Sequence, residues 1–153
     1  MDSAEIKMQV VGYSTGVGLV QQAGCCVRLE YRDEYGRKSH RMFTYPIGCA
    51  TEERAHLQAA HLALASVVKM MRKLAVVEVA CPSIVCDVVD NPDMIIDGCD
   101  DVANEIRKWA SFYNDIHFDA RSINDLPVED ARRCAESQQA LDTGTEEEEC
   151  RKK

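Results

Sequence analysis

The sequence predicts an α/β domain in which a mixed five-stranded sheet carries helices on its faces. Three observations predict it: alternating strands at the start of the chain, one long amphipathic helix, and strand and helix segments after that helix. Strands followed by alternating helices and strands are typical of a mixed sheet covered by helices. The chain has 153 residues, which suits a single domain with its own core.

The first part of the chain predicts an antiparallel meander of three strands. Residues 8–14 form the first expected strand, and residues 25–32 alternate apolar and charged side chains as a half-buried strand does. A turn signal at 33–36 separates them from a third strand at 37–47. Pro46 lies near the end of that strand, where a missing N–H costs least.

A long helix is expected to begin after Thr51, which is a favourable N-cap residue. Glu52 and Glu53 in its first turn, and basic residues near its end, suit the helix dipole. Apolar residues recur at helical spacing on one face, which indicates deep packing. These residues are Leu57, Ala60, Leu64, Val67, Val68 and Met71.

The remainder of the chain predicts alternating strands and helices. Residues 74–80 are almost entirely apolar and indicate a buried strand parallel to an earlier one. The elements expected after it are a short helix at 82–89, a helix beginning at Asp100, a strand at 116–118 and a helix beginning at Pro127. The domain is expected to span residues 1–140, because residues 141–153 are strongly acidic and predict a disordered tail.

Composition and charge bound the function. The net charge of −8 disfavours nucleic acid as a partner, because a phosphate backbone favours dense Lys and Arg. No apolar run approaches the roughly 18 residues that cross a membrane, so no membrane partner is expected. The first residues are unlike a secretory signal, and the expected location is cytoplasmic or nuclear. Eight cysteines without a C-x-x-C pair predict reduced, mostly buried thiols rather than disulfides or a zinc site.

Three stretches of the sequence carry a family resemblance through their order and spacing. The segment 14–24 begins Ser-Thr-Gly, ends Ala-Gly and resembles a small-residue loop. Residues 51–60 are Thr-Glu-Glu-Arg-Ala-His-Leu-Gln-Ala-Ala. Residues 117–121 and 129–135 form a strand and the start of a final helix. Together these stretches resemble type I ribonuclease H, especially the compact domains common in plant genomes and retroelements. The resemblance covers about residues 8–140 and implies the fold of that family.

The resemblance also implies a site in which four carboxylates hold two divalent cations, and this chain departs from it at all four positions. Magnesium requires hard oxygen ligands, and a metal pair activates water and stabilises the leaving oxygen. The residues at the four positions are Gly12, His56, Pro82 and Arg132. Glycine and proline offer no donor, imidazole is a poor magnesium ligand, and a guanidinium repels cations. The sequence therefore predicts no catalytic residues, no metal and no cofactor.

Two interpretations of neighbouring residues stay open. Glu53, Asp87 and Asp90 could rebuild a displaced metal site, although solvated surface carboxylates are the favoured interpretation. If His56 and Arg132 both faced the former metal site, they would form a positive pocket for a phosphate or an acidic side chain.

Three functions compete at this stage. The favoured one is a noncatalytic interaction or scaffold domain with a protein partner, of which a homodimer is one form. The second is a non-cleaving binder of RNA/DNA hybrid or duplex, and the third is a residual metal-dependent ribonuclease. The second would need a basic patch on the predicted hairpin, formed by Arg28, Arg32, Arg37, Lys38 and Arg41. The chain as given could also be a piece of a longer protein.

Overall fold

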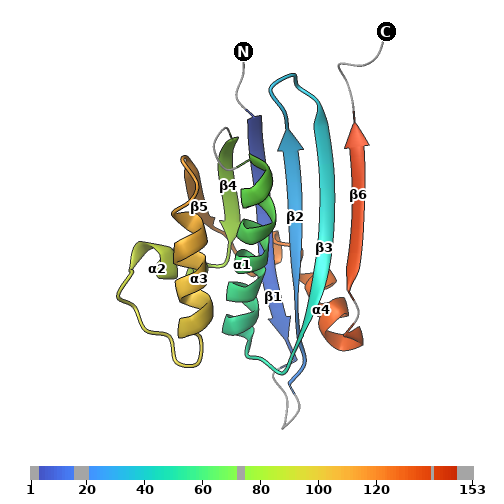
Figure 1. Cartoon of the computed structure of the whole chain (residues 1–153). Helices are drawn as coiled ribbons and strands as arrows, with labels where there is room; N and C mark the ends of the chain where they lie inside the picture. The colour runs from blue at the N-terminus through green and yellow to red at the C-terminus, as the bar shows by residue number, and fades with distance from the viewer. Residues whose placement is uncertain (1–3, 16–20, 72–74, 139, 148–153) are drawn as a thin grey trace.

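The computed structural model describes residues 4–15, 21–71, 75–138 and 140–147. One six-stranded sheet runs through the molecule in the order β5-β4-β1-β2-β3-β6 (Figure 1). The strands are β1 (Ala4–Ser14), β2 (Ala23–Arg32), β3 (Lys38–Gly48), β4 (Ala75–Cys81), β5 (Ile116–Ala120) and β6 (Leu141–Glu147). The helices are α1 (Glu52–Met71), α2 (Ser83–Asp90), α3 (Asp100–Ala110) and α4 (Val128–Ser137), with a 3-10 turn at Ile123–Asp125.

Every helix and strand expected from the sequence is present, in the expected order. Strands β1, β2 and β3 form the antiparallel meander, and β4 pairs parallel with β1 and β5. Thr51 caps α1 as expected, because its Oγ1 accepts a hydrogen bond from the backbone N–H of Arg54 at 3.2 Å. None of the described helices combines the length and hydrophobicity that a membrane span requires.

The sixth strand, β6, corrects the sequence prediction. Residues 141–153 were expected to be a disordered tail, yet Leu141–Glu147 pair antiparallel with β3. The guanidinium of Arg41 donates two hydrogen bonds to the carboxylate of Asp142, at 3.0 and 2.6 Å. The sheet therefore has six strands rather than five and continues past residue 140, while residues 148–153 lie outside the described part of the chain.

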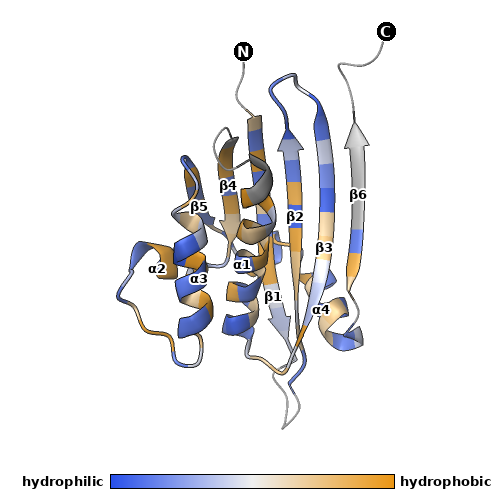
Figure 2. Ribbon diagram, in the orientation of Figure 1, coloured by the Kyte–Doolittle hydropathy of each residue, from blue (hydrophilic) through white to orange (hydrophobic). Residues whose placement is uncertain are grey.

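The sheet separates two unequal cores. Side chains alternate along β1, so Met8 and Val10 pack with α1, α2 and α3 in the larger core. Val11 points to the other face and packs with Leu126 and Ala131 around α4 in a smaller core. Figure 2 shows hydrophobic colour along the middle of the central strands, whereas the turn that joins β2 and β3 is hydrophilic.

A glycine lets α4 approach the sheet closely. A Cβ added to Gly24 of β2 would lie 2.7 Å from the backbone nitrogen of Ala135, which is closer than real Cβ contacts. At the end of α4, Gln138 adopts a left-handed conformation with φ 52° and its side chain donates to the carbonyl of Ala23 at 3.1 Å. These contacts fix α4 against the end of β2.

Candidate functional site

The first of the four expected positions, Gly12, lies in direct contact with the start of α1. A Cβ added to Gly12 would lie 2.2 Å from the backbone carbon of Ala55 and 2.5 Å from its Cβ. It would also lie 2.5 Å from the backbone nitrogen of His56. Only glycine fits here without a shift of α1, so the space that a carboxylate would fill on β1 is taken up by the helix backbone.

His56 occupies the second position and bonds directly to the first. Its Nδ1 accepts a hydrogen bond from the backbone N–H of Gly12 at 2.9 Å. The pairing of β1 with β4 ends at Gln9, so this N–H lies beyond the β1–β4 ladder and the imidazole satisfies it. The side chain of His56 is only 5% exposed.

The protonation of His56 follows from this hydrogen bond. Because Nδ1 accepts, the ring is neutral and carries its proton on Nε2, which lies 3.4 Å from Oε2 of Glu52. Burial lowers the pKa of His56, while the nearby carboxylates of Glu52 and Glu53 act in the opposite direction. His56 is therefore a neutral, buried partner of the backbone.

The third position, Pro82, is the N-cap residue of α2. It is buried, has an extended conformation (φ −61°, ψ 153°) and makes no side-chain capping bond. Its backbone carbonyl accepts from the N–H of Val85 at 3.0 Å, which closes the first turn of the helix. Pro82 thus directs the chain from β4 into α2.

The fourth position, Arg132, lies on α4 and is paired with acids of its own helix. Its guanidinium forms ion pairs with Glu129 and, at 3.8 Å, with Glu136. The side chain is 43% exposed, and α4 packs on the face of the sheet opposite to α1. The contacts shown thus pair His56 with Gly12 and Glu52, and Arg132 with the acids of its own helix, and they do not support a shared positive pocket.

We compared the sequence and the structure of this chain with those of known proteins. No family model matches the sequence, and no curated protein does. RNase H1 of the archaeon Halobacterium salinarum matches with 15% identity and a TM-score of 0.61, over 88% of this chain and 99% of that chain. LC11-RNase H1, solved in complex with RNA/DNA hybrid, matches with 18% identity and a TM-score of 0.67, over 87% and 98%.

A third match is the N-terminal RNase H domain of a Mycobacterium tuberculosis protein, with 18% identity and a TM-score of 0.60. It extends over 90% of this chain and 100% of that chain. The chain has the ribonuclease H fold. The fold class expected from the sequence is thus confirmed, with six strands in place of five.

A magnesium pair does not fit the four residues of this ribonuclease H-like domain. Gly12 and Pro82 have no donor atom, Arg132 carries a fixed positive charge, and Nδ1 of His56 is already occupied by the Gly12 N–H. Magnesium binds hard oxygen ligands, so this donor set offers it nothing to coordinate.

The acidic residues considered as a displaced site are spread over two helices. Glu53 lies in the first turn of α1, whereas Asp87 and Asp90 lie on α2, and all three are exposed. Within the described part of the chain, no group of three His, Cys, Asp or Glu side chains is close enough to hold a metal ion.

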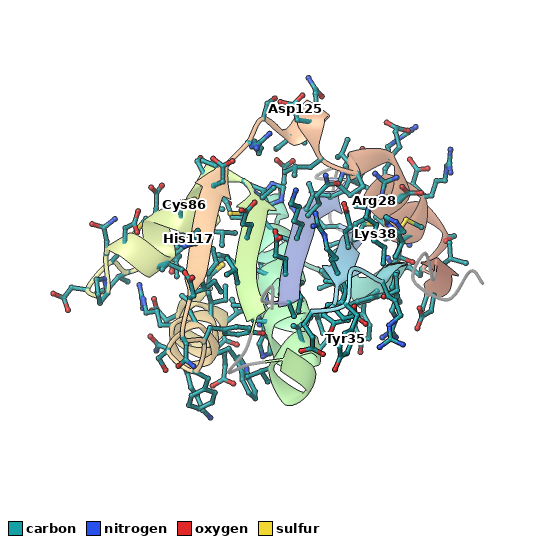
Figure 3. All side chains as sticks on the ribbon, turned by 90° about the horizontal axis from the view of Figure 1, so that it is seen from above. Arg28, Tyr35, Lys38, Cys86, His117 and Asp125 are labelled. Carbon is teal, nitrogen blue, oxygen red and sulfur yellow. The ribbon has the colours of Figure 1, made fainter. Side chains whose placement is uncertain are left out.

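The five basic residues of the β2–β3 hairpin do not form one patch. Arg28, Arg32 and Lys38 point to the face that carries α4, where Glu30 lies between the two arginines on β2 (Figure 3). The other two pair with acids elsewhere: Arg37 Nε lies 2.7 Å from Asp33, and Arg41 binds Asp142. Carboxylates thus pair with Arg37 and Arg41, whereas Arg28, Arg32 and Lys38 share one face of the sheet with Glu30.

The described cysteines are free thiols, and most of them are buried. Cys49 is exposed and Cys86 half-buried, while the other described cysteines are buried, in agreement with the expectation of mostly buried thiols. Burial raises the pKa of Cys26 to about 12, and the same effect raises the pKa of Cys81 and Cys134. A raised pKa disfavours the thiolate that a nucleophile needs.

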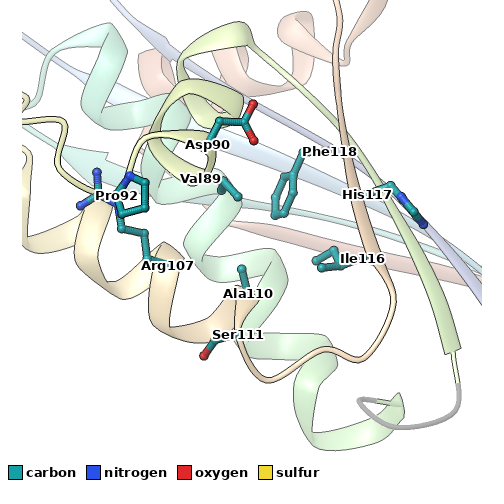
Figure 4. A pocket seen from close by; sticks show the side chains of 9 residues that line it. All are labelled: Val89, Asp90, Pro92, Arg107, Ala110, Ser111, Ile116, His117 and Phe118. Atoms are coloured by element: carbon teal, nitrogen blue, oxygen red, sulfur yellow. The ribbon is translucent and has the colours of Figure 1, made fainter.

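An open pocket that the sequence did not predict lies between α2, α3 and β5 (Figure 4). Its volume is about 540 Å³. It is lined by Val89, Asp90, Pro92, Arg107, Ala110, Ser111, Ile116, His117 and Phe118. No motif signals it, because its walls come from three elements that only the tertiary fold brings together.

Arg107 in the pocket wall holds the loop after α2. Its Nε donates to the carbonyl of Val88 at 3.0 Å, and its Nη2 donates to the carbonyls of Asn91 and Met94 at 3.1 and 3.0 Å. This guanidinium is thus engaged with backbone oxygens, and the floor of the pocket is mainly apolar.

Proposed function

We propose that this ribonuclease H-like domain does not cleave nucleic acid and acts as an interaction or scaffold module that binds protein. The observation that carries the proposal is the contact between Gly12 and α1. Ala55 lies so close to Gly12 that a carboxylate cannot be placed where the resemblance puts the first metal ligand. Without that ligand set, the two-metal mechanism of a ribonuclease H has no basis.

The surroundings of His56 support the same proposal. The imidazole is buried between α1 and β1 and serves as the hydrogen-bond partner of the Gly12 N–H. An unpaired N–H at this depth would destabilise the fold by about 1–3 kcal/mol, so His56 has a structural role at this position. The residues at two former ligand positions therefore stabilise the fold together.

The strands at the two edges of the sheet support a role in protein binding. The chain forms two apolar cores on a six-stranded sheet, and within the described residues no strand pairs with the outer side of β5 or of β6. Edge strands are frequent sites of contact between proteins. The ion pairs of Arg37 and Arg41 reduce the positive charge that the β2–β3 hairpin offers to a phosphate backbone, and the net charge of −8 acts in the same direction.

A cleavage assay tests the first half of this proposal. The full chain is incubated with an end-labelled RNA/DNA hybrid in Mg²⁺ and in Mn²⁺, next to an active RNase H1 as positive control. We expect no cleavage above the background without protein. Metal-dependent cleavage that disappears in the triple variant Glu53→Gln, Asp87→Asn, Asp90→Asn would overturn the proposal and establish a displaced site.

A binding titration tests the preference for protein over nucleic acid. The same labelled hybrid, and a DNA duplex, are titrated with the chain at several salt concentrations. Binding to phosphates weakens steeply as salt rises. We expect no such salt-dependent binding, and its presence would assign the domain to the non-cleaving hybrid or duplex binders instead.

A further inference from the structure

Acidic and basic side chains alternate along one face of β5. Asp115, His117, Asp119 and Arg121 occupy every second position, so all four point to the same side of the sheet. They are 51%, 67%, 59% and 53% exposed. Within the strand, His117 Nε2 lies 2.7 Å from Asp115 Oδ1, and Arg121 Nε lies 2.7 Å from Asp119 Oδ2.

The outer side of β5 presents backbone groups to solvent. On the inner side, Val77 N–H donates to the carbonyl of Asp115 at 2.9 Å and Arg121 N–H donates to the carbonyl of Cys81 at 2.8 Å. Successive residues of a strand direct their N–H and C=O to opposite sides, so those of 116, 118 and 120 point away from β4. Nothing in the described chain pairs with these groups, and such an edge is a template for another strand.

We propose that the chain forms a symmetric dimer in which β5 pairs antiparallel with β5 of a second copy. The two-fold axis passes between the two Phe118 residues, and Ile116 lies opposite Ala120 of the second copy. All three residues have outward-pointing N–H and C=O groups, so each opposed pair exchanges two hydrogen bonds. This inference rests on the proposed function, because it assumes that the domain acts by binding protein, and it names a second copy of the chain as the partner.

The charged face of β5 is complementary to itself in this register. Asp115 lies opposite Arg121 of the second copy, and His117 lies opposite Asp119 of the second copy. The symmetry repeats both pairs, so the junction carries two Asp115–Arg121 ion pairs and two His117–Asp119 contacts on one face, the latter being ion pairs when the imidazole is protonated. Opposite charges directly across an antiparallel pair stabilise it.

The same side chains disfavour the neighbouring registers. With the axis at His117, Asp115 would face Asp119 of the second copy. With the axis at Asp119, the two copies of Asp119 would face each other, and His117 would face Arg121. Like charges directly opposite destabilise a strand pair, so the alternation selects the register centred on Phe118.

The other face of β5 contributes apolar contact. Figure 4 shows Ile116 and Phe118 directed into the open pocket and His117 directed away from it. Across the two-fold axis the two Phe118 side chains lie next to each other, beside Val89 and Ala110 in the pocket wall. Pairing therefore covers the mouth of this pocket as it joins two sheets into one.

Sedimentation and light scattering of the full chain over the micromolar range test the dimer. We expect the mass to rise with concentration from 17.1 kDa toward twice that value. Ala120→Pro removes one outward N–H without touching the bonds to β4, and we expect it to weaken association by at least about tenfold. Ala120→Ser is the matched control, because it keeps the N–H and should associate as the original chain does.

Charge reversal tests the register. Asp119→Arg places an arginine opposite His117 of the second copy and should weaken association, whereas adding His117→Glu to it restores an opposed acid–base pair and should recover association. Circular dichroism checks that each variant is folded. A chain that stays monomeric throughout, or a dimer that Ala120→Pro leaves unchanged, would overturn the inference.

The outcomes separate this inference from the proposed function. Cleavage of hybrid by a dimeric chain would contradict the noncatalytic proposal and leave the β5 dimer intact. A monomer that does not cleave would contradict the dimer alone.

Discussion

Gly12 of β1 and Ala55 of α1 are in contact at a separation that leaves no space for one additional methyl group. This contact joins the central strand to the longest helix, and the imidazole of His56 completes it from the same turn of α1. One packing arrangement thus includes two of the four positions at which the sequence resemblance would place metal ligands.

The first prediction follows from that contact. Gly12→Ala should lower the free energy of unfolding by about 2 kcal/mol or more, because the added Cβ must push α1 away from β1. Urea unfolding followed by circular dichroism measures it. The exposed Lys7 on the same strand is the matched control, and Lys7→Ala should change the free energy by less than about 0.5 kcal/mol. Equal effects of the two substitutions would contradict the close packing.

The second prediction concerns pH. The pKa of His56 is lowered in the fold, whereas in the unfolded chain the imidazole titrates near 6.5. The native state therefore binds the proton less readily, so the stability that neutral His56 contributes is complete above pH 6.5 and is lost as the pH falls below it. Urea unfolding at pH 7.5 and at pH 5.5 should show this loss, and His56→Gln should reduce it.

Two comparisons secure the pH assignment. Asp101, whose pKa is about 2 beside Arg54, titrates well below this window and does not contribute to it. Lys7→Ala removes no histidine and is the matched control, so it should lose stability over the same pH window as the original chain does. A loss of stability that is the same with and without His56 would contradict the prediction.

The third prediction is that restoring the carboxylates does not restore cleavage. A variant with Gly12→Asp, His56→Glu, Pro82→Asp and Arg132→Asp should fail to unfold cooperatively, because the first two changes overpack the contact and bury charge. The two-site variant with only Pro82→Asp and Arg132→Asp should fold, since aspartate is a favourable N-cap residue. Neither should cleave RNA/DNA hybrid with Mg²⁺, and cleavage by the four-site variant would show that α1 moves aside readily.

The fourth prediction concerns Tyr113, which follows α3 and forms a hydrogen bond with α1. Its phenol donates a buried hydrogen bond to the carbonyl of Leu64 at 2.6 Å, and burial raises its pKa. Tyr113→Phe should lower the free energy of unfolding by about 1 kcal/mol. Tyr45 is 51% exposed and serves as the control, because Tyr45→Phe should have almost no effect in the same urea titration.

Local patterns in the sequence were sufficient for most of the fold. The alternation at 25–32 and the helical spacing from Leu57 to Met71 are visible in short windows, and both elements form as expected. Strand β6 was missed because its acidic composition predicts disorder when it is read alone. Its pairing is with β3, and the Arg41 of that strand lies 101 residues before its partner Asp142.

The sequence resemblance singled out Gly12 and His56 but did not predict the contact between them. The residues at positions 12 and 56 could be named from the resemblance, but the hydrogen bond between them joins two elements 44 residues apart. The separation of His56 from Arg132 likewise depends on which face of the sheet each helix covers, and no local pattern carries that information. The pocket beside β5 likewise depends on the tertiary fold, because its lining residues come from α2, α3 and β5.

The directions of the strands have a practical consequence for work with this domain. β1 begins and β6 ends at the same end of the sheet, since each step from β1 through β2 and β3 to β6 reverses direction (Figure 1). The contact between Gly12 and His56 lies toward the opposite end. A dye, a surface tether or a fused protein joined at either terminus would therefore be attached on one side and leave the far side accessible.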